Sequence, residues 1–134
     1  MTAGLSKQRQ QLWRAHAAVG RTLRRLQRSQ PMIQGSFYLL HRKCGKPNCR
    51  CASGRPADLH DRWVLTRSEQ GRHRLYSVPK EERAAVRQGA AEYRHYLRAR
   101  AVLVQRQAGL LARADEIAAH RLLLWPTKKT EPPP

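Results

Sequence analysis

The chain has 134 residues, in which 27 lysines and arginines stand against nine acidic residues, so its formal net charge at pH 7 is +18. This length suits one domain and leaves little room for two. Hydrophobic residues make up 40 %, but only one is phenylalanine, which predicts a thin core that a bound metal would reinforce. The charge favours a polyanionic partner, either nucleic acid or an anionic membrane surface, because binding relieves self-repulsion and releases counterions.

The cysteines point to a reducing compartment. All three lie within residues 44–51, and an odd, tightly spaced set does not suit a disulfide framework. The first ten residues lack the apolar stretch of a secretory signal, and the longest apolar run, residues 122–125, is too short to span a bilayer. We therefore expect a cytoplasmic, nucleoid-associated protein without a membrane partner.

Residues 5–30 are predicted to form the first helix. Leucine or valine recurs every seven residues from Leu5 to Leu26, which gives one apolar stripe, and Pro31 ends the helix. The segment has seven basic residues and no acid, which allows either a solvated face or contacts with phosphates. The candidates for such contacts are Arg21, Arg24, Arg25 and Arg28.

Residues 35–79 are predicted to form a three-stranded antiparallel sheet with a zinc knuckle. Strands are expected at 35–43, 62–67 and 72–78, where aromatic and branched residues gather between turn residues. The alternation predicts two different sides. Expected toward the core are Trp63, Leu65, Leu75 and Val78, and expected on the open side are Arg62, Arg67, Arg72 and Arg74.

Residues 80–125 are predicted to form a long second helix. Its apolar stripe comprises Val86, Ala90, Tyr93, Leu97, Ala101, Val104, Ala108, Leu111, Ala114, Ala118 and Leu122. A stripe this long outruns a small sheet, so it must pack on another helix. We expect the first helix to cover part of it as an antiparallel hairpin, and a second copy or another partner to cover the rest. The expected fold is α+β, with one domain at 1–126 and a disordered tail at 127–134.

A metal site is predicted from the cysteines. Cys44, Cys49 and Cys51 are joined by a turn-forming Gly-Lys-Pro-Asn, and His60 follows after a loop rich in glycine and proline. Three thiolates and one imidazole are a set that structural zinc prefers. The alternative fourth ligand is His41, and weaker candidates are Asp58 and Asp61. Metal-free thiols are the other interpretation, which the surrounding cations disfavour because they would leave oxidisable thiolates exposed.

No catalytic pattern accompanies this cluster. A zinc site closed by four protein ligands has no open position, although a water in place of the fourth ligand would permit hydrolysis. No serine lies in a glycine-flanked elbow, and no glycine-rich phosphate loop is present. The remaining histidines are interpreted as surface or packing residues: His16, His73, His95 and His120. We therefore expect a protein that is not an enzyme.

The sheet region carries the features of a nucleic-acid-binding surface. Residues 35–80 hold ten lysines and arginines against three acids. Arginines on a β-ribbon can enter a major groove, whereas aromatics such as Tyr38 and Trp63 stack on unpaired bases when they are not part of a core. The candidates for contacts with nucleic acid are Lys46, Arg50, Arg62, Arg67, Arg72 and Arg74.

Several motifs together resemble one family of small bacterial proteins of unknown function. They are Gly-Ser-x-Tyr at 35–38, Cys-Gly-Lys-Pro-Asn-Cys-Arg-Cys at 44–51, the downstream histidine, and Val-Pro-Lys at 78–80 before a long helix. Members of that family are often encoded beside transposases or other mobile-element genes. The resemblance spans roughly residues 34–100, and the cysteine motif is its most specific part. It implies a metal knuckle and a mobile-element context, without an established activity.

The leading hypothesis is a zinc-stabilised, non-enzymatic DNA-binding accessory protein that assists a transposase or recombinase. One alternative is an RNA-binding module, which the same charges and aromatics permit. Another is a protein-interaction scaffold that uses the long helix. Competition between duplex DNA and structured RNA separates the first two.

Overall fold

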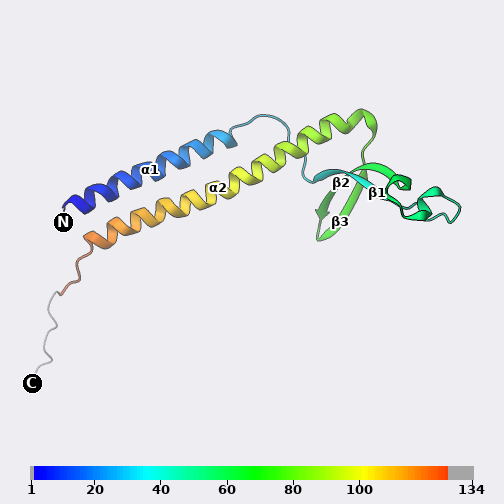
Figure 1. Ribbon diagram of the computed structural model, residues 1–134. Helices are drawn as coiled ribbons and strands as arrows, with labels where there is room; N and C mark the ends of the chain where they lie inside the picture. The colour runs from blue at the N-terminus through cyan, green and yellow to red at the C-terminus, as the bar shows by residue number, and fades with distance from the viewer. Residues whose placement is uncertain (1, 127–134) are drawn as a thin grey trace, which may run out of the picture. The chain divides into compact units, whose positions relative to one another are not determined.

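The computed structural model describes residues 2–126 and contains two long helices and one sheet (Figure 1). The elements are α1 (Thr2–Leu26), β1 (Ser36–Arg42), β2 (His60–Glu69), β3 (Arg72–Ser77) and α2 (Arg83–Arg121), with short 3-10 helices η1 (Arg50–Ser53), η2 (Pro56–Asp58) and η3 (Lys80–Glu82). The predicted α+β class, with a helix, a three-stranded antiparallel sheet and a long second helix, is confirmed. The predicted tail, 127–134, lies outside the described residues.

The chain divides into two compact units, one formed by residues up to 28 and from 98 on, the other by residues 29–97. Both helices end four residues earlier than predicted, at Leu26 and Arg121. Proline disfavours helix in the residue before it, and here Pro31 and Pro126 follow stretches that leave the helix several residues ahead of them.

In the sheet unit, the strands are ordered β1-β2-β3 and all neighbours are antiparallel. The turn from β2 to β3 consists of Gln70 and Gly71, both with positive φ, as a two-residue hairpin turn requires. The central strand supplies most of the core, because Val64, Leu65 and Thr66 are all buried. The sheet core is therefore narrow, as the composition predicted.

Cross-strand pairing corrects the predicted basic side of this sheet. Arg67 pairs with Arg74, and Arg72 pairs with Glu69. These arginines therefore share the face of Leu65 and Trp63, since side chains alternate along a strand, and Arg62 lies on the opposite face. The prediction that all four arginines share one open side is wrong.

The predicted core side needs one correction as well. Leu65 and Val78 are buried as predicted. Leu75, however, pairs with Thr66 and so lies on the face opposite Leu65, where it is 38 % exposed. The register of β3, which the hairpin turn sets, decides this placement.

An arginine of α2 anchors that helix to the sheet. Phe37 and Trp63 stack with their ring centroids 5.0 Å apart, and the guanidinium of Arg87 lies 5.5 and 5.1 Å from the two centroids. A cation over two aromatic faces is attracted by both ring quadrupoles. No pattern around Arg87 in the sequence indicated this contact, because it requires strands and helix to be already in place.

In the other unit, α1 and the C-terminal part of α2 form the predicted antiparallel hairpin. Arg106 Nη1 donates to the Ala18 carbonyl at 2.9 Å and to Thr22 Oγ1 at 2.6 Å, and Arg113 Nη1 donates to Gln11 Oε1 at 3.2 Å. A later residue of α2 thus contacts an earlier residue of α1, as in an antiparallel pair. Thr22 is fully buried, and its hydroxyl both donates to the Ala18 carbonyl at 3.2 Å and accepts from Arg106, so this buried polar group is fully paired.

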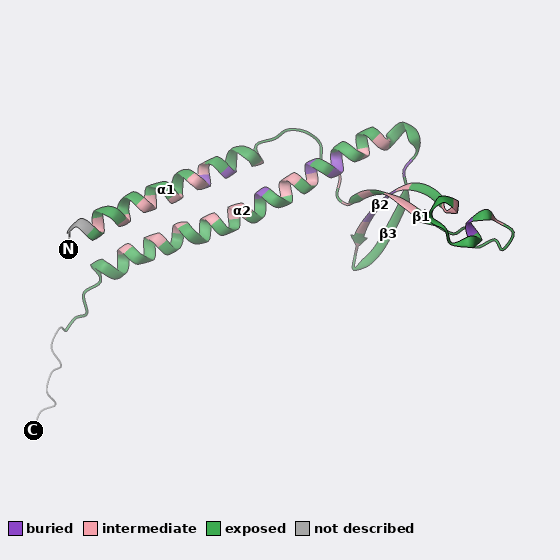
Figure 2. Ribbon diagram, viewed as in Figure 1, coloured by how far each residue is buried: buried purple, intermediate pink, exposed green. Residues whose placement is uncertain are grey.

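The face of α2 that packs on α1 is not the predicted apolar stripe. The half-buried positions are Val102, Leu103, Arg106, Leu110, Arg113 and Ile117. Val104 and Leu111 of the predicted stripe are instead 53 % and 64 % exposed. Figure 2 shows the C-terminal part of α2 coloured mainly as exposed. The expectation that α1 covers this part of the stripe is wrong, because the face that packs on α1 carries two arginines, Arg106 and Arg113, whose hydrogen bonds to α1 hydrophobic periodicity does not register.

Two glycines of α2, Gly89 and Gly109, are expected to respond in opposite ways to substitution by alanine. A Cβ at Gly89 would lie 2.6 Å from Ile33 Cγ1, and Ile33 N–H already donates to the Gly89 carbonyl at 3.0 Å. A Cβ at Gly109 would meet nothing within 4 Å. We expect Gly89→Ala to destabilise by about 1–3 kcal/mol through overpacking, and Gly109→Ala to stabilise by up to about 1 kcal/mol through helix propensity. Urea unfolding checks both, and equal gains from the two would contradict the Ile33 contact.

Candidate metal centre

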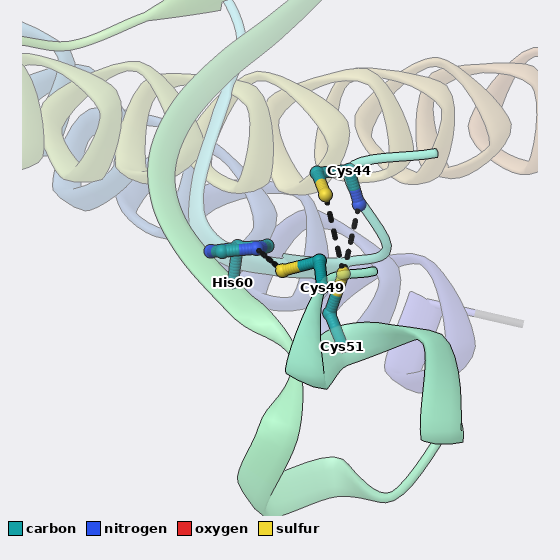
Figure 3. Close-up of side chains that lie close together, drawn as sticks. All are labelled: Cys44, Cys49, Cys51 and His60. Atoms are coloured by element: carbon teal, nitrogen blue, oxygen red, sulfur yellow. Dashed lines mark hydrogen bonds between the residues drawn. The ribbon is translucent and has the colours of Figure 1, made fainter. Parts of the chain in front are cut away.

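The candidate metal centre lies at the connection between β1 and β2, where Arg42 pairs with His60. Residues 43–59, called here the knuckle loop, carry all three cysteines, and His60 opens β2. The ligand atoms of Cys44, Cys49, Cys51 and His60 all lie within 4.8 Å of one another. Figure 3 shows the four side chains converging on one point from the loop and the strand.

Local turns fold the knuckle loop into this shape. Gly45 has φ 86°, and Cys49 N–H then donates to the Lys46 carbonyl at 3.2 Å. The helix η1 follows at once and ends at Gly54, whose φ of 73° is left-handed. The reversal at Gly45 and the turn from Lys46 to Cys49 bring Cys51 back to Cys44, so that Cys44 N–H donates to Cys51 Sγ at 3.2 Å and the two sulfurs lie 3.4 Å apart.

Asp58, one of the weaker ligand candidates, is used inside the loop. Its Oδ1 accepts from Arg50 Nε at 2.7 Å, and its Oδ2 accepts from Ser53 Oγ at 2.8 Å. The carboxylate is largely buried, with 10 % of its side-chain surface exposed. Asp58 therefore joins the two short helices of the loop and does not belong to the cluster.

The structure brings His60, and not His41, to the thiols. His60 Nε2 lies 3.1 Å from Cys49 Sγ. His41 pairs directly with Asp61 across β1 and β2, and its Nδ1 contacts the Asp61 carboxylate. Within the described residues, the group of potential ligands that meets at this point contains neither of these two side chains.

The four residues fit a tetrahedral ion. Zinc–sulfur and zinc–nitrogen bonds of about 2.3 and 2.0 Å imply ligand–ligand separations of about 3.5–3.8 Å. The separations of 3.4 Å between Cys51 and Cys44 and 3.1 Å between Cys49 and His60 lie slightly below this range, and all the others are within 4.8 Å, so a small rearrangement of the side chains would seat the ion. Thiolates with one imidazole favour a soft or borderline ion over calcium or magnesium.

Electrostatics divide the three thiols. The backbone of Lys46, followed by the Cys51 side chain, lowers the pKa of Cys44, and the backbone of Cys51, followed by His60, lowers the pKa of Cys49. The backbone of Cys44 lowers the pKa of Cys51, but burial and the two neighbouring thiols outweigh it and raise that pKa. Metal binding must displace protons from such thiols, so affinity falls as pH falls.

One comparison with known proteins identifies a family. The family described as a domain of unknown function (DUF6788) matches residues 5–88, which cover α1, the sheet, the four clustered residues and the start of α2. The chain belongs to this family. Neither the curated proteins nor the solved structures give a match. No helix within residues 2–126 is long and apolar enough to cross a membrane.

A basic hollow adjoins the cluster of this DUF6788 member. Its volume is about 300 Å³, and it is lined by Arg42, Lys43, Cys44, His60, Asp61 and Arg62. Two of these cations, Arg42 and Lys43, were not among the residues predicted to contact nucleic acid. The sequence could have indicated both, because they directly precede Cys44 and a folded knuckle fixes the residues next to its first ligand.

The predicted nucleic-acid contacts of the sheet unit fall into three groups. Arg62 lines the hollow beside the cluster, and Lys46 is exposed on the knuckle loop. Arg50 is paired with Asp58, and Arg67 is paired with Glu69 at 2.6 Å while lying over the Tyr76 ring. The third group, Arg72 and Arg74, lines a second hollow that also contains Glu69.

The remaining candidates, Arg21, Arg24, Arg25 and Arg28, are exposed and belong to the other compact unit. Within the sheet unit, the predicted residues therefore do not form one patch. Those already paired with carboxylates have less charge to offer a phosphate, whereas the hollow beside the cluster brings together Arg42, Lys43 and Arg62 with one acid, Asp61.

Proposed function

We propose that this protein is a zinc-stabilised, non-enzymatic accessory protein that binds duplex DNA. The observation that supports this most directly is the hollow where Arg42, Lys43 and Arg62 stand beside Cys44 and His60. A bound ion would fix the end of the β1–β2 hairpin and with it the positions of these cations. The net charge of +18 adds a general attraction to a polyanion.

The donor set supports zinc in a structural role. Three cysteines and one histidine can complete a tetrahedron, which leaves no open position for a substrate or a reactive water. The ion would then hold together a long loop that the narrow sheet core does not stabilise by itself. This is the ground for proposing a protein without catalytic activity.

Contacts with duplex DNA are favoured over stacking on unpaired bases. Phe37 and Trp63 stack on each other and under Arg87, and the Tyr76 hydroxyl donates to Glu69 at 2.6 Å beneath Arg67. These rings are engaged within the fold. Tyr76 and Tyr38 are 41 % and 39 % exposed, but they lie on opposite faces of the sheet, so each face offers one such ring, which makes a poor stacking platform. RNA binding is therefore the second candidate function.

The proposed setting is the bacterial cytoplasm, on the nucleoid, with a transposase or recombinase as the protein assisted. Support for it comes from the resemblance of the cysteine motif to proteins encoded beside mobile elements. The exposed stripe of α2 offers a surface for protein contacts, so a protein-interaction scaffold is the alternative from another class.

We expect the double substitution Arg42→Gln/Arg62→Gln to weaken duplex binding and to make its salt dependence shallower by about 1.8 in the log–log slope, for two lost phosphate contacts. The measurement is fluorescence anisotropy of a labelled duplex over a salt series, with metal content checked in each variant. The matched control is Arg9→Gln/Arg14→Gln, which removes the same charge from exposed positions of α1. Equal losses in both variants would sink the assignment of the hollow, and stronger competition by structured RNA would favour the RNA alternative.

A further inference from the structure

The C-terminal part of α2 leaves an apolar seam uncovered. The seam consists of Ala101, Val104, Ala108 and Leu111, all of which are exposed. Their spacings of three, four and three residues are those of a heptad a/d pattern. The two positions that flank its middle, Gln105 and Gln107, are uncharged. A coiled-coil contact therefore meets no like charges at its centre.

The sizes of the seam residues fit a second copy that runs in the opposite direction. If Val104 of one copy lies opposite Ala108 of the other, the antiparallel register places Ala101 opposite Leu111. Each layer then joins a large side chain to a small one, which allows close helix packing without a cavity. A parallel pairing would place the two leucines together and the alanines together, with gaps between the alanine layers.

The charges at the two ends of the seam fit the same arrangement. Arg98 lies eight residues before position 106, the centre of that register, and Asp115 lies nine residues after it. An antiparallel pair therefore brings Arg98 of each copy near Asp115 of the other. A parallel pair would set Arg98 beside Arg98, and a uniformly acidic partner would oppose Asp115.

We propose that two copies of this protein associate through an antiparallel contact of their α2 helices along the seam. The contact depends on neither the metal nor nucleic acid, because the seam and its flanking charges lie in the compact unit formed by residues up to 28 and from 98 on, which does not contain the metal centre. The net charge of +18 per copy opposes association over long range. Salt screens this repulsion while apolar burial persists, so the dimer withstands salt that weakens DNA binding.

The first test is sedimentation equilibrium of the full chain at low and high salt. We expect a monomer–dimer equilibrium for the wild type. Val104→Lys/Leu111→Lys is expected to raise the dissociation constant at least about 100-fold, since two apolar side chains lose their burial. The matched control, Gln10→Lys/Ala17→Lys, adds the same charge at exposed positions of α1 and is expected to leave the equilibrium unchanged. A wild-type monomer at all concentrations, or equal losses in both variants, overturns the proposal.

A charge exchange tests the direction of pairing and uses only exposed positions, so it does not depend on a seam variant that folds poorly. Arg98→Glu alone and Asp115→Arg alone are each expected to weaken the dimer, because each sets like charges together. The double variant is expected to restore it. Failure of the double variant to recover any affinity rejects the antiparallel register. Far-UV circular dichroism of each variant confirms that the helices remain.

Discussion

Replacing His60 by glutamine is expected to lower metal affinity by more than about 100-fold, a larger loss than the 10–100-fold typical of residues that only support a ligand. Its Nε2 lies 3.1 Å from Cys49 Sγ, and within the described residues it is the one imidazole that meets the three thiols. Replacing His41 by glutamine is expected to leave the affinity unchanged, because His41 contacts Asp61 instead. Competition with a chromophoric zinc chelator measures both affinities, and mass spectrometry of the purified proteins gives the metal content.

The two histidine variants control for each other. Both residues lie beside the same loop, both are exposed, and the substitution is the same. Cys51→Ser supplies a third variant, expected to lose the metal because the buried thiol lies 3.4 Å from Cys44 Sγ. If His41→Gln lost metal while His60→Gln retained it, the ligand set drawn from the geometry would be wrong. If no variant or wild-type protein held metal, the cluster would be a group of three free thiols.

The knuckle was predictable because its signal is local in the sequence. Three cysteines within eight residues around a turn can meet only a few partners, and His60 needs just one short loop to reach them. The choice of His60 over His41 was less certain from sequence. It rests on the register of β1 and β2, which places His41 opposite Asp61 and leaves His60 at the first position of β2.

The two failed predictions both depend on tertiary structure that a hydrophobic pattern does not contain. A hydrophobic pattern treats arginine as a surface residue, yet Arg106 and Arg113 donate hydrogen bonds to α1, and the guanidinium of Arg87 lies over two rings of the sheet. The predicted stripe of α2 consequently faces away from α1. Likewise, the hydrophobic pattern located β2 and β3 but did not fix their register. All four arginines were therefore predicted on one side, whereas the pairing places Arg62 on the other. Arginine contacts with α1 decide the first outcome, and the strand register that the hairpin turn sets decides the second.

Removing the metal is expected to unfold the sheet unit and to leave the helical hairpin folded. The sheet core is small, centred on Val64, Leu65 and Val78, and the knuckle loop costs entropy to close. Zinc contributes about 10–16 kcal/mol in zinc-finger peptides, which matches or exceeds the whole stability of about 5–15 kcal/mol of an ordinary domain. The contact between Arg106 and Thr22 lies in the other unit and does not depend on the ion.

Fluorescence of Trp63 reports this selective unfolding. Trp13 and Trp125 are largely exposed, so a Trp13→Phe/Trp125→Phe background leaves Trp63 as the single tryptophan at little cost in stability. On chelation, the emission of Trp63 is expected to shift to the red as its stack with Phe37 opens, while most of the helical signal at 222 nm remains. Added zinc is expected to reverse the shift in this background but not when His60→Gln is also present. An unchanged emission after verified loss of the metal would show that the ion does not stabilise the sheet, and simultaneous loss of the helical signal would show that the two units do not fold independently.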